Sequence, residues 1–458
     1  MMLNDVFERF AADSPICVMA RATLENVFAE DRLNTIFDEN AQKQRDGELL
    51  FSTVADIMGS VVCRIRPSVN AAYIARADEI GVTVKAVYDK LKGIEDGVSR
   101  GLVRETASHM ATIIEETKAT LPGLLPGYRV KIVDGNHLRR TDRRIEELRK
   151  LTAAPLPGKA LAVLDPRLML VIDVLLCEDG HAQERRLLPE LSESIERRDL
   201  WIADRNFCTT RFLFTFFSKH AYFAIRQHGS NLRWDLEGRR KKIGKIKTGI
   251  VYEQAMRIFD GENVRVIRRI TVELNEPTRD GDWEIHILTN LPKKVRVQKI
   301  AELYADRWMI ETAFQEMAEN LEGEINTLGY PKAALFGFCM ALVSYNVLSV
   351  VRAAIRAAHR VAEAKNVSSY YMADEIAGTY RGMLIALPAP YWTERFNKLT
   401  PRQMAKALVR LAKKVKLSKY QKHKWSPTKQ RKKKNVKPGK HVSTAQILEQ
   451  RKEKNRAA

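Results

Sequence analysis

Short apolar runs alternate with more polar segments between residues 127 and 226, and this alternation constrains the fold more than any other feature of the chain. Two of the runs are joined at Asp165-Pro166, which is a hairpin signal. Helices are expected at about 188–198 and 210–219, between the later runs. Strands and helices in this order predict an α/β layer. The apolar runs lie at 130–133, 161–164, 168–176, 200–203 and 221–226.

The regions on either side of this layer have different textures. Residues before 120 place apolar side chains three and four positions apart, which is typical of helices. Two alternating runs, at 264–274 and 283–291, indicate strands separated by a turn. The expected order is therefore an all-helical module at 1–120, an α/β domain at 125–228 plus 291–360, a β-rich insertion at 229–290, helices at 361–412 and a basic, flexible tail at 413–458.

One segment is apolar enough to raise the question of a membrane. Residues 333–351 carry no charge over 19 positions, which is just long enough to span a bilayer. The run contains Asn346 and Tyr345, and Arg352 follows at once. A helix buried in a large core is the better interpretation. The beginning of the chain does not resemble a signal peptide, and the five cysteines form no Cys-x-x-Cys pair, so we expect a reducing cytoplasm and no membrane partner.

The charge of the chain is concentrated at one end. There are 77 Lys and Arg against 56 Asp and Glu, a net charge of +21. Residues 401–458 hold 20 of these basic residues and 2 Glu, a net of +18, so residues 1–400 carry only +3. A basic tail on a near-neutral body indicates a polyanionic partner, with nucleic acid as the first candidate. An acidic membrane surface and a merely solubilising tail remain the alternatives.

Three acids stand out by their positions. Asp134 and Asp204 each follow a short strand of the α/β layer, and Glu311 lies in a helix expected from 297 to 321. Two carboxylates at adjacent strand ends and a third from a helix above can meet at one point. Oxygen ligands of this kind suit Mg²⁺, and a pair of such ions supports in-line phosphoryl transfer. A single carboxylate, by contrast, is usually a surface group or a cap.

The helix around Glu311 adds specificity. Tyr304, Arg307 and Glu311 are spaced three and four apart, so they share one helical face. An arginine can clamp a phosphate with two hydrogen bonds, and a tyrosine can donate a third. The alternative is an ordinary exposed face with an Arg–Glu pair.

Five short motifs in a fixed order resemble the DDE transposases of bacterial insertion sequences. The motifs are Asp134-Gly-Asn, Ile202-Ala-Asp204-Arg-Asn-Phe207, Phe223-Ala-Ile-Arg226, Ile287-Leu-Thr-Asn-Leu-Pro292 and Tyr304-x2-Arg307-x3-Glu311. The last is similar to the Tyr-Arg-Glu-Lys signature of one subgroup, which has a β insertion before the Glu. Here Ala318 stands where the signature Lys belongs, so that phosphate contact is absent or replaced.

The resemblance implies a ribonuclease H-like catalytic domain in which Asp134, Asp204 and Glu311 bind two Mg²⁺ ions, with Mn²⁺ as a substitute. Water would cut the strand at the element end, and the freed 3′-OH would attack target DNA. The module at 1–120 would recognise the terminal inverted repeats, and two ends would be paired by a homodimer in the bacterial nucleoid. A hairpin route would use Trp283 to stack on a flipped base.

Several of these assignments have plain alternatives. Trp283 could belong to the core of the insertion, and Asp173, although acidic and in an apolar strand, lies mid-strand and suits a structural role. A basic run could follow DNA phosphates or form a solvated loop; it comprises Arg239, Arg240, Lys241 and Lys242. For the whole protein, a ribonuclease H-like nuclease without strand joining and a catalytically decayed DNA-binding protein are the alternatives to a transposase.

Overall fold

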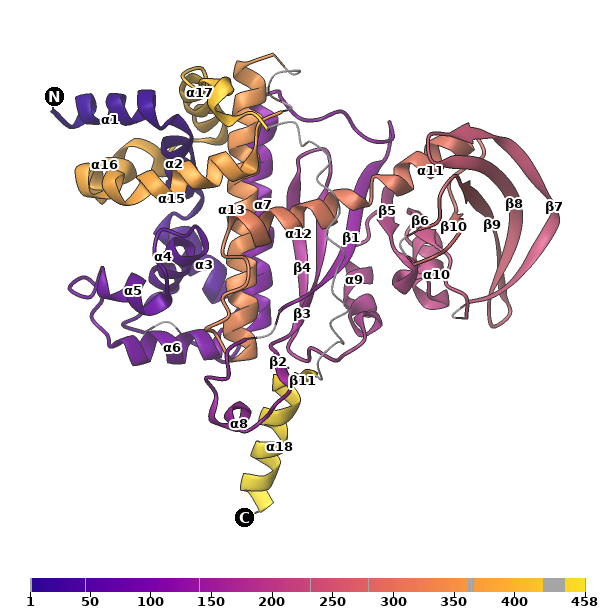
Figure 1. Ribbon diagram of the computed structural model, residues 1–458, viewed down its shortest axis with the longest axis horizontal. Helices are drawn as coiled ribbons and strands as arrows, with labels where there is room; N and C mark the ends of the chain where they lie inside the picture. Colours follow the sequence, from indigo (N-terminus) through magenta and orange to yellow (C-terminus); the bar gives the residue numbers. More distant parts are fainter. Residues whose placement is uncertain are drawn as a thin grey trace.

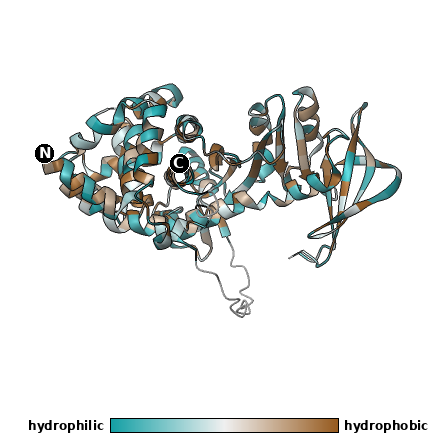
Figure 2. Cartoon of the chain, turned by 90° about the horizontal axis from the view of Figure 1, so that it is seen from above, coloured by the Kyte–Doolittle hydropathy of each residue, from teal (hydrophilic) through white to brown (hydrophobic). Residues whose placement is uncertain are grey.

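The computed structural model shows a helical bundle at one end, a large sheet in the middle and a curled group of strands at the other end (Figure 1). Seen from above, these three parts lie in a row along the longest axis (Figure 2). The structure describes residues 2–45, 47–139, 141–230, 232–278, 280–360, 364, 366–422 and 441–457.

The first part of the chain is helical, as expected. Pro15 opens the second helix at a position where a missing backbone N–H costs nothing, and the side chains of Ser68 and Thr83 cap two others. The helices bury their apolar faces against one another and against later helices. They are α1 Met2–Asp13, α2 Pro15–Val27, α3 Glu30–Asn40, α4 Phe51–Val62, α5 Val69–Ile74, α6 Val84–Gly93 and α7 Asp96–Glu116.

A 28-residue helix, α13 Pro331–Ala358, forms the spine of the bundle. It is long and apolar enough to cross a membrane by length and composition, but the window that meets this test is 100% buried inside the protein. It packs against α7, α4 and α6, and also against strand β4 of the sheet. Its uncharged surface is therefore explained by burial on all sides. The remaining helices of the bundle are α15 Ser369–Ala386, α16 Ala389–Trp392 and α17 Pro401–Ala412.

The sheet has nine strands in the order β4-β3-β1-β5-β6-β10-β9-β8-β7. Strand β1 runs antiparallel to β3 and parallel to β5, and β5 runs parallel to β6, so the sheet is mixed. Helices lie between several of the strands in sequence, which confirms the mixed α/β class. The strands are β1 Arg129–His137, β3 Lys159–Asp165, β4 Leu170–Cys177, β5 Asp199–Ala203, β6 Tyr222–Arg226, β7 Arg233–Ile246, β8 Gly249–Asp260, β9 Asn263–Leu274 and β10 Glu284–Thr289.

The first strand is longer than the sequence indicated. We expected it to end at Asp134, but β1 continues to His137. Its pairing with β5 stops at Ile132, whereas its pairing with β3 continues through Asp134 to the last residue. Pairing with β3 therefore keeps the polar segment Asp-Gly-Asn-His extended, although its sequence lacks the apolar pattern of a strand.

The β insertion has four strands instead of the two predicted, and it is continuous with the main sheet. Strand β10 pairs with β6 on one side and with β9 on the other. The basic run, for which a solvated loop was one of two interpretations, lies in β7, which pairs with β8 over its length. β7 has polar side chains on both faces, so its sequence lacks the period-two pattern of a strand. It is the outermost strand, with a neighbouring strand on one edge only.

The helix expected from 297 to 321 is broken. It consists of α11 Val297–Ala305 and α12 Trp308–Asn320, with a turn at Asp306 and Arg307. Backbone bonds across the turn join residues three apart, such as Arg307 N to Tyr304 O and Met309 N to Asp306 O. The tighter turn rotates α12 relative to α11, and it places Arg307 at the break.

The tail also differs from the prediction where it is described. Strand β11 His441–Ser443 pairs parallel with β2 Ala154–Leu156, and α18 Thr444–Ala457 follows it. Arg451 of α18 forms an ion pair with Glu147 of the short helix α8 Glu146–Arg149. These contacts anchor the end of the chain, which the Lys-rich composition did not indicate. Residues 423–440, which the flexible-tail prediction also covers, lie outside the described residues.

Candidate active site

Two of the three predicted acids come from neighbouring parallel strands. Asp204 directly follows β5, and its side chain accepts a hydrogen bond from the Asn206 N–H at 2.8 Å. Asp134 lies in β1 beyond the last residue paired with β5, and its Oδ1 accepts from the Gly135 N–H at 2.9 Å. Because β1 and β5 are parallel, both carboxylates are at the carboxyl end of the strand pair, the edge where ligands bind in open α/β sheets.

Arg307 joins these strands to the helix that carries the third acid. Its Nη1 lies 2.6 Å from Asp134 Oδ2, and its Nη2 lies 2.7 Å from Glu311 Oε1. The same guanidinium donates a hydrogen bond to the Tyr304 hydroxyl. Tyr304 and Glu311 are three and four residues from Arg307, so the three side chains lie on the same side of the α11–α12 segment.

The carboxylates of the site carry more negative charge than Arg307 neutralises. Burial raises the pKa of Asp134 to about 7; the charges of Asp204 and Glu311 add to this rise, and Arg307 opposes it. Burial also raises the pKa of Asp204. The phenol of Tyr304 is largely buried, and its pKa is raised to about 12, so it stays protonated and remains a donor. Perturbed acids around one cation are typical of functional sites.

A fourth carboxylate, Glu184, lies at this site and was missed by the sequence analysis. It accepts a hydrogen bond from Asn206 Nδ2 at 3.3 Å and lies 3.5 Å from His137 Nε2. A Cβ at Gly135 would lie 2.4 Å from its Oε1, so a larger residue there would require the Glu184 side chain to shift. Its charge contributes to the raised pKa of Asp204. The one sequence signal was Gly135 itself, which marks a close approach without naming the partner.

The donor set has the chemistry of a divalent-cation site but not the arrangement. Carboxylate oxygens are the ligands that Mg²⁺ and Mn²⁺ prefer. Among the residues that the structure describes, however, no group of three His, Cys, Asp or Glu is placed to hold a metal ion. The Arg307 guanidinium lies between Asp134 and Glu311 and occupies the position of a cation. The residues as arranged therefore do not fit a metal until Arg307 moves.

Four of the predicted DNA-binding residues lie on β7, the outermost strand of the insertion. Arg239, Lys241 and Lys242 are exposed on β7. Arg240 is held in place, because its Nη1 lies 2.7 Å from Glu284 Oε1 and its guanidinium covers the Tyr252 ring at 3.9 Å.

Two tryptophans near the site are exposed to solvent. Trp283 precedes β10 and is 60% exposed, so it does not belong to the core of the insertion. Trp308 is 61% exposed, and its ring lies 5.3 Å from the Arg307 guanidinium. The sequence analysis did not select Trp308, although its position next to Arg307 was a visible signal.

A polar hollow of 380 Å³ lies between the main sheet and the insertion. Arg205, the residue after Asp204, forms one part of its wall, and Asp282 and Glu284, which flank Trp283, form another. Arg226 also lines the hollow and pairs with Asp282 at 2.6 Å. The hollow therefore connects the surroundings of Asp204 with those of Trp283.

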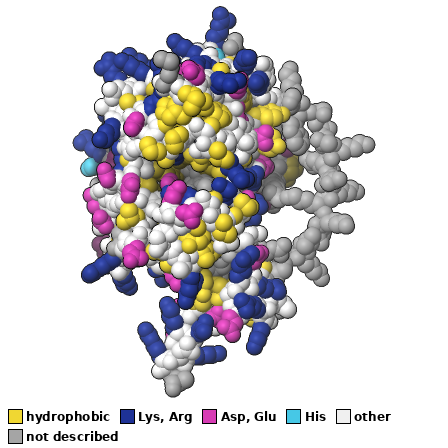
Figure 3. Space-filling model, turned by 90° about the vertical axis from the view of Figure 1, so that its left-hand side faces the viewer, with side chains coloured by type: hydrophobic (Ala, Val, Ile, Leu, Met, Phe, Trp, Pro, Cys, Tyr) yellow, Lys and Arg dark blue, Asp and Glu magenta, His cyan; other side chains and the backbone are white. Residues whose placement is uncertain are grey.

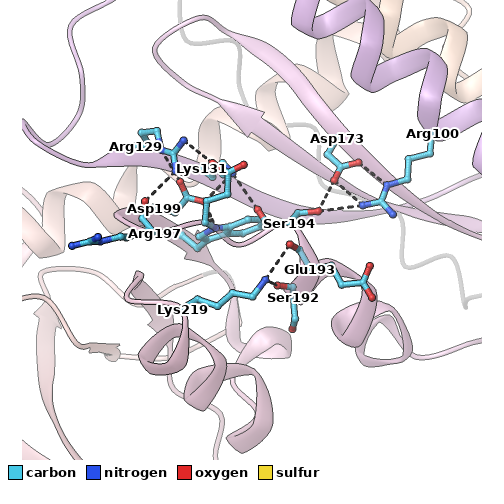
Figure 4. Close-up of polar contacts among 12 residues, drawn as sticks. Arg100, Arg129, Lys131, Asp173, Ser192, Glu193, Ser194, Arg197, Asp199 and Lys219 are labelled. Carbon is cyan, nitrogen blue, oxygen red and sulfur yellow. Dashed lines mark hydrogen bonds and ion pairs between the residues drawn. The ribbon is translucent and has the colours of Figure 1, made fainter. Parts of the chain in front are cut away.

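Asp173, by contrast, has a structural role. It is buried on β4 and forms a two-point contact with Arg100 of α7, at 2.8 and 2.9 Å, and it accepts from Ser194 Oγ (Figure 4). This contact joins the helical bundle to the sheet.

The segment that carries these acids is similar to a known protein family. Residues 125–347 match the family model of the transposase DDE domain, a segment that contains all three predicted acids. The match supports a transposase of the DDE class, as the motifs indicated, whereas the insertion-sequence subgroup stays a prediction. No curated protein sequence matches the chain.

One similar solved structure is the piggyBac transposase in a synaptic complex with hairpin DNA, determined by cryo-EM. It is 12% identical, and the alignment covers 88% of this chain and 86% of that one with a TM-score of 0.39. A likeness this distant does not define the fold or the function of the present chain.

Proposed function

We propose that this protein is a transposase that binds the ends of a bacterial insertion sequence, cleaves the DNA there and joins it to target DNA. The observation that carries the proposal is the convergence of Asp134 and Glu311 on Arg307 beside Asp204, within the segment that matches the transposase DDE domain. The position of Asp134 and Asp204 at the carboxyl end of parallel strands supports a ribonuclease H-like catalytic domain.

In this proposal Asp134, Asp204 and Glu311 would hold divalent cations, Mg²⁺ or Mn²⁺, when Arg307 moves aside. A bound cation would supply activation of the attacking oxygen and stabilisation of the leaving one. Arg307 and Tyr304 would then be free to donate hydrogen bonds to a DNA phosphate. Arg239, Lys241 and Lys242 would contact the backbone of the same duplex from β7, with Arg240 behind them.

Trp283 suits the role of a stacking partner for an unpaired base. Trp283 is exposed, and the residues on either side of it, Asp282 and Glu284, line the polar hollow; base–aromatic stacking contributes about 1–3 kcal/mol. A homodimer that pairs two element ends, in the bacterial cytoplasm, completes the proposal.

The role of the helical module remains a prediction that its charge does not support. Residues 1–120 contain 14 Lys and Arg against 19 Asp and Glu, a net charge of −5. The outer end of the bundle shows basic side chains scattered among acidic and hydrophobic ones, not gathered in one patch (Figure 3). Recognition of terminal repeats by this module would have to rest on a few specific contacts rather than on its overall field.

The test is cleavage and joining of a duplex taken from the DNA that borders this protein's gene, with Mg²⁺ and target plasmid present. Wild type would be compared with Asp204→Ala and Glu311→Ala. Cation-dependent nicking at the element end, joining to target and loss of both in the two variants are the expected results.

The two alternatives give different outcomes in the same assay. Nicking without joining would favour a ribonuclease H-like nuclease, or a transfer defect caused by Ala318. Binding without cleavage, unchanged in both variants, would contradict the enzymatic proposal and leave a decayed DNA-binding protein.

A further inference from the structure

A second charged hollow lies at the opposite end of the same parallel strands. Its volume is 810 Å³, and it is formed by the segments that lead into β1, β5 and β6 and by the segment that leads into α11. We call it the basic pocket. Its basic lining consists of Arg197, Arg198, Lys294, Arg296 and Lys299, and His220 lies among them.

The charge of the basic pocket is not neutralised by the protein. Its lining contains no carboxylate. Within the described part of the chain, none of its five Lys and Arg side chains takes part in an ion pair; Arg198 donates only to the Gly127 carbonyl, at 3.3 Å. Five like charges around one hollow repel one another, and an anion bound there would remove that repulsion.

Neighbouring cations show that unpaired charge is not the general state of this end of the sheet. Lys131 lies 2.8 Å from Asp199, which is fully buried, and Arg129 pairs with both Asp199 and Glu196. Arg197 is adjacent to this cluster, yet its guanidinium points away from it (Figure 4). Arg129 and Lys131 are therefore paired with acids, whereas the cations of the basic pocket form no ion pair within the described part of the chain.

Other features of the basic pocket also favour a phosphate. Tyr128 and Tyr222 form part of its wall, with their rings edge to face at 4.9 Å. Burial raises the pKa of Tyr128, so its hydroxyl stays a donor. Helix α11 begins at the pocket with Arg296 at its N-cap and no side-chain cap, so its first N–H groups add positive potential.

The basic pocket is too far from the acids to serve the same phosphate. From Arg129 to Asp134, β1 rises by about 3.3 Å per residue, so the two sites are separated by roughly 16 Å. Helix α11 connects them, because it starts at the pocket and ends beside Arg307. A chain of phosphates several nucleotides long could contact both sites at once.

We propose that the basic pocket binds the sugar-phosphate backbone of DNA several nucleotides away from the phosphate that reacts. The inference rests on the proposed function only in naming DNA as the polyanion. Phosphate contacts of this kind position a duplex without reading its sequence.

The test uses the full-length protein and a labelled duplex of arbitrary sequence, with binding followed by anisotropy over a range of salt. Arg197→Glu with Lys294→Glu changes two exposed pocket residues. Arg402→Glu with Lys406→Glu changes two exposed residues of α17 and alters the net charge equally. The pocket variant should bind roughly tenfold more weakly, with a salt slope lower by about 2, while the control stays near wild type. Circular dichroism and thermal unfolding of both variants would establish that they are folded.

Equal weakening in the two variants would overturn the inference, because net charge alone would then explain the loss. Calorimetric binding of inorganic phosphate that depends on Arg197 and Lys294, with duplex binding unchanged, would overturn DNA as the occupant and indicate a small phosphate ligand. The proposed function is tested separately, by the nicking assay. Duplex binding lost in the pocket variant of a protein that never nicks DNA would support the pocket and contradict the enzyme.

Discussion

At the carboxyl end of β1 and β5, several carboxylates share the single guanidinium of Arg307; at the amino end of the same strands, the five cations of the basic pocket have no carboxylate among them. The buried parts of the strands between the two ends are mostly apolar, and the buried acid Asp199 is already paired with Lys131 and Arg129. Each end therefore carries an unbalanced charge that the fold does not need. The difference indicates which ligand each end accepts, a cation on one side and a polyanion on the other.

The largest expected effect is on the chemistry at the acid end. Glu311→Gln keeps the size of the side chain but removes a charged oxygen donor. We expect nicking of the element end to fall on the order of 10³-fold or more, with duplex binding retained. A gel assay of single-turnover cleavage measures this, and the basic-pocket variant, which should lose binding first, is the contrast. Cleavage within a few fold of wild type would show that Glu311 does not act at the site.

Replacement of Arg307 by an uncharged residue tests the charge balance at the carboxyl end of β1 and β5. Arg307→Met leaves Asp134 and Glu311 without their partner, so the free energy of unfolding should fall by about 3–5 kcal/mol at pH 8 and by less at pH 5, where Asp134 is protonated. Urea denaturation at the two pH values measures the change.

The same variant separates a cation position from an ordinary ion pair. If the guanidinium occupies the place of a metal, Mg²⁺ should raise the melting temperature of Arg307→Met more than that of wild type. An equal response of the two proteins to Mg²⁺ would mean that Arg307 does not compete with the metal.

The titration of Asp134 gives a pH dependence with a defined sign. Its folded pKa, about 7, is above the unfolded value of about 3.9, so the folded state holds the proton more tightly. Stability from this group is full below the unfolded value and is lost as pH rises to about 7, by up to about 4 kcal/mol. Stability curves of wild type and Asp134→Asn should differ in slope across this window, and parallel curves would contradict the assignment.

The smallest effect concerns the exposed tryptophans. Trp283→Ala should weaken stacking by about 1–3 kcal/mol, and Trp283→Phe should retain most of it. A fluorescent base analogue at the element end reports the unstacked base directly. Trp308→Ala is the matched change on the other side of the site. A larger loss of stacking for Trp308→Ala than for Trp283→Ala would identify Trp308 of α12, not Trp283 of the insertion, as the stacking partner.

The sequence indicated candidate acids, but it did not indicate all of their surroundings. Apolar runs that stop at a carboxylate leave a local pattern, and so Asp134 and Asp204 could be selected. Glu184 lies in a polar segment without such a pattern, and its carboxylate comes close to Gly135 only in the folded chain. The break at Arg307 was also hidden, since the residues on both sides of it have ordinary helical character.

The missed strands have a related cause. Strand β7 is polar on both faces, and β11 is three residues long in a Lys-rich segment, so neither shows a strand period. β11 is held by backbone pairing with β2, a partner far away in sequence, and β7 by pairing with β8, which follows it directly in a hairpin. Helix α13 is the opposite case. Its sequence has no polar face, which correctly indicated that other elements surround the helix.

Helix α13 is shared by the helical bundle and the sheet, because it contacts α4, α6, α7 and β4 along its length. Exposure of its apolar surface on either side would leave a wide hydrophobic face in water. The two halves of the molecule should therefore melt in one cooperative transition, and amide protons in the middle of α13 should exchange only through global unfolding.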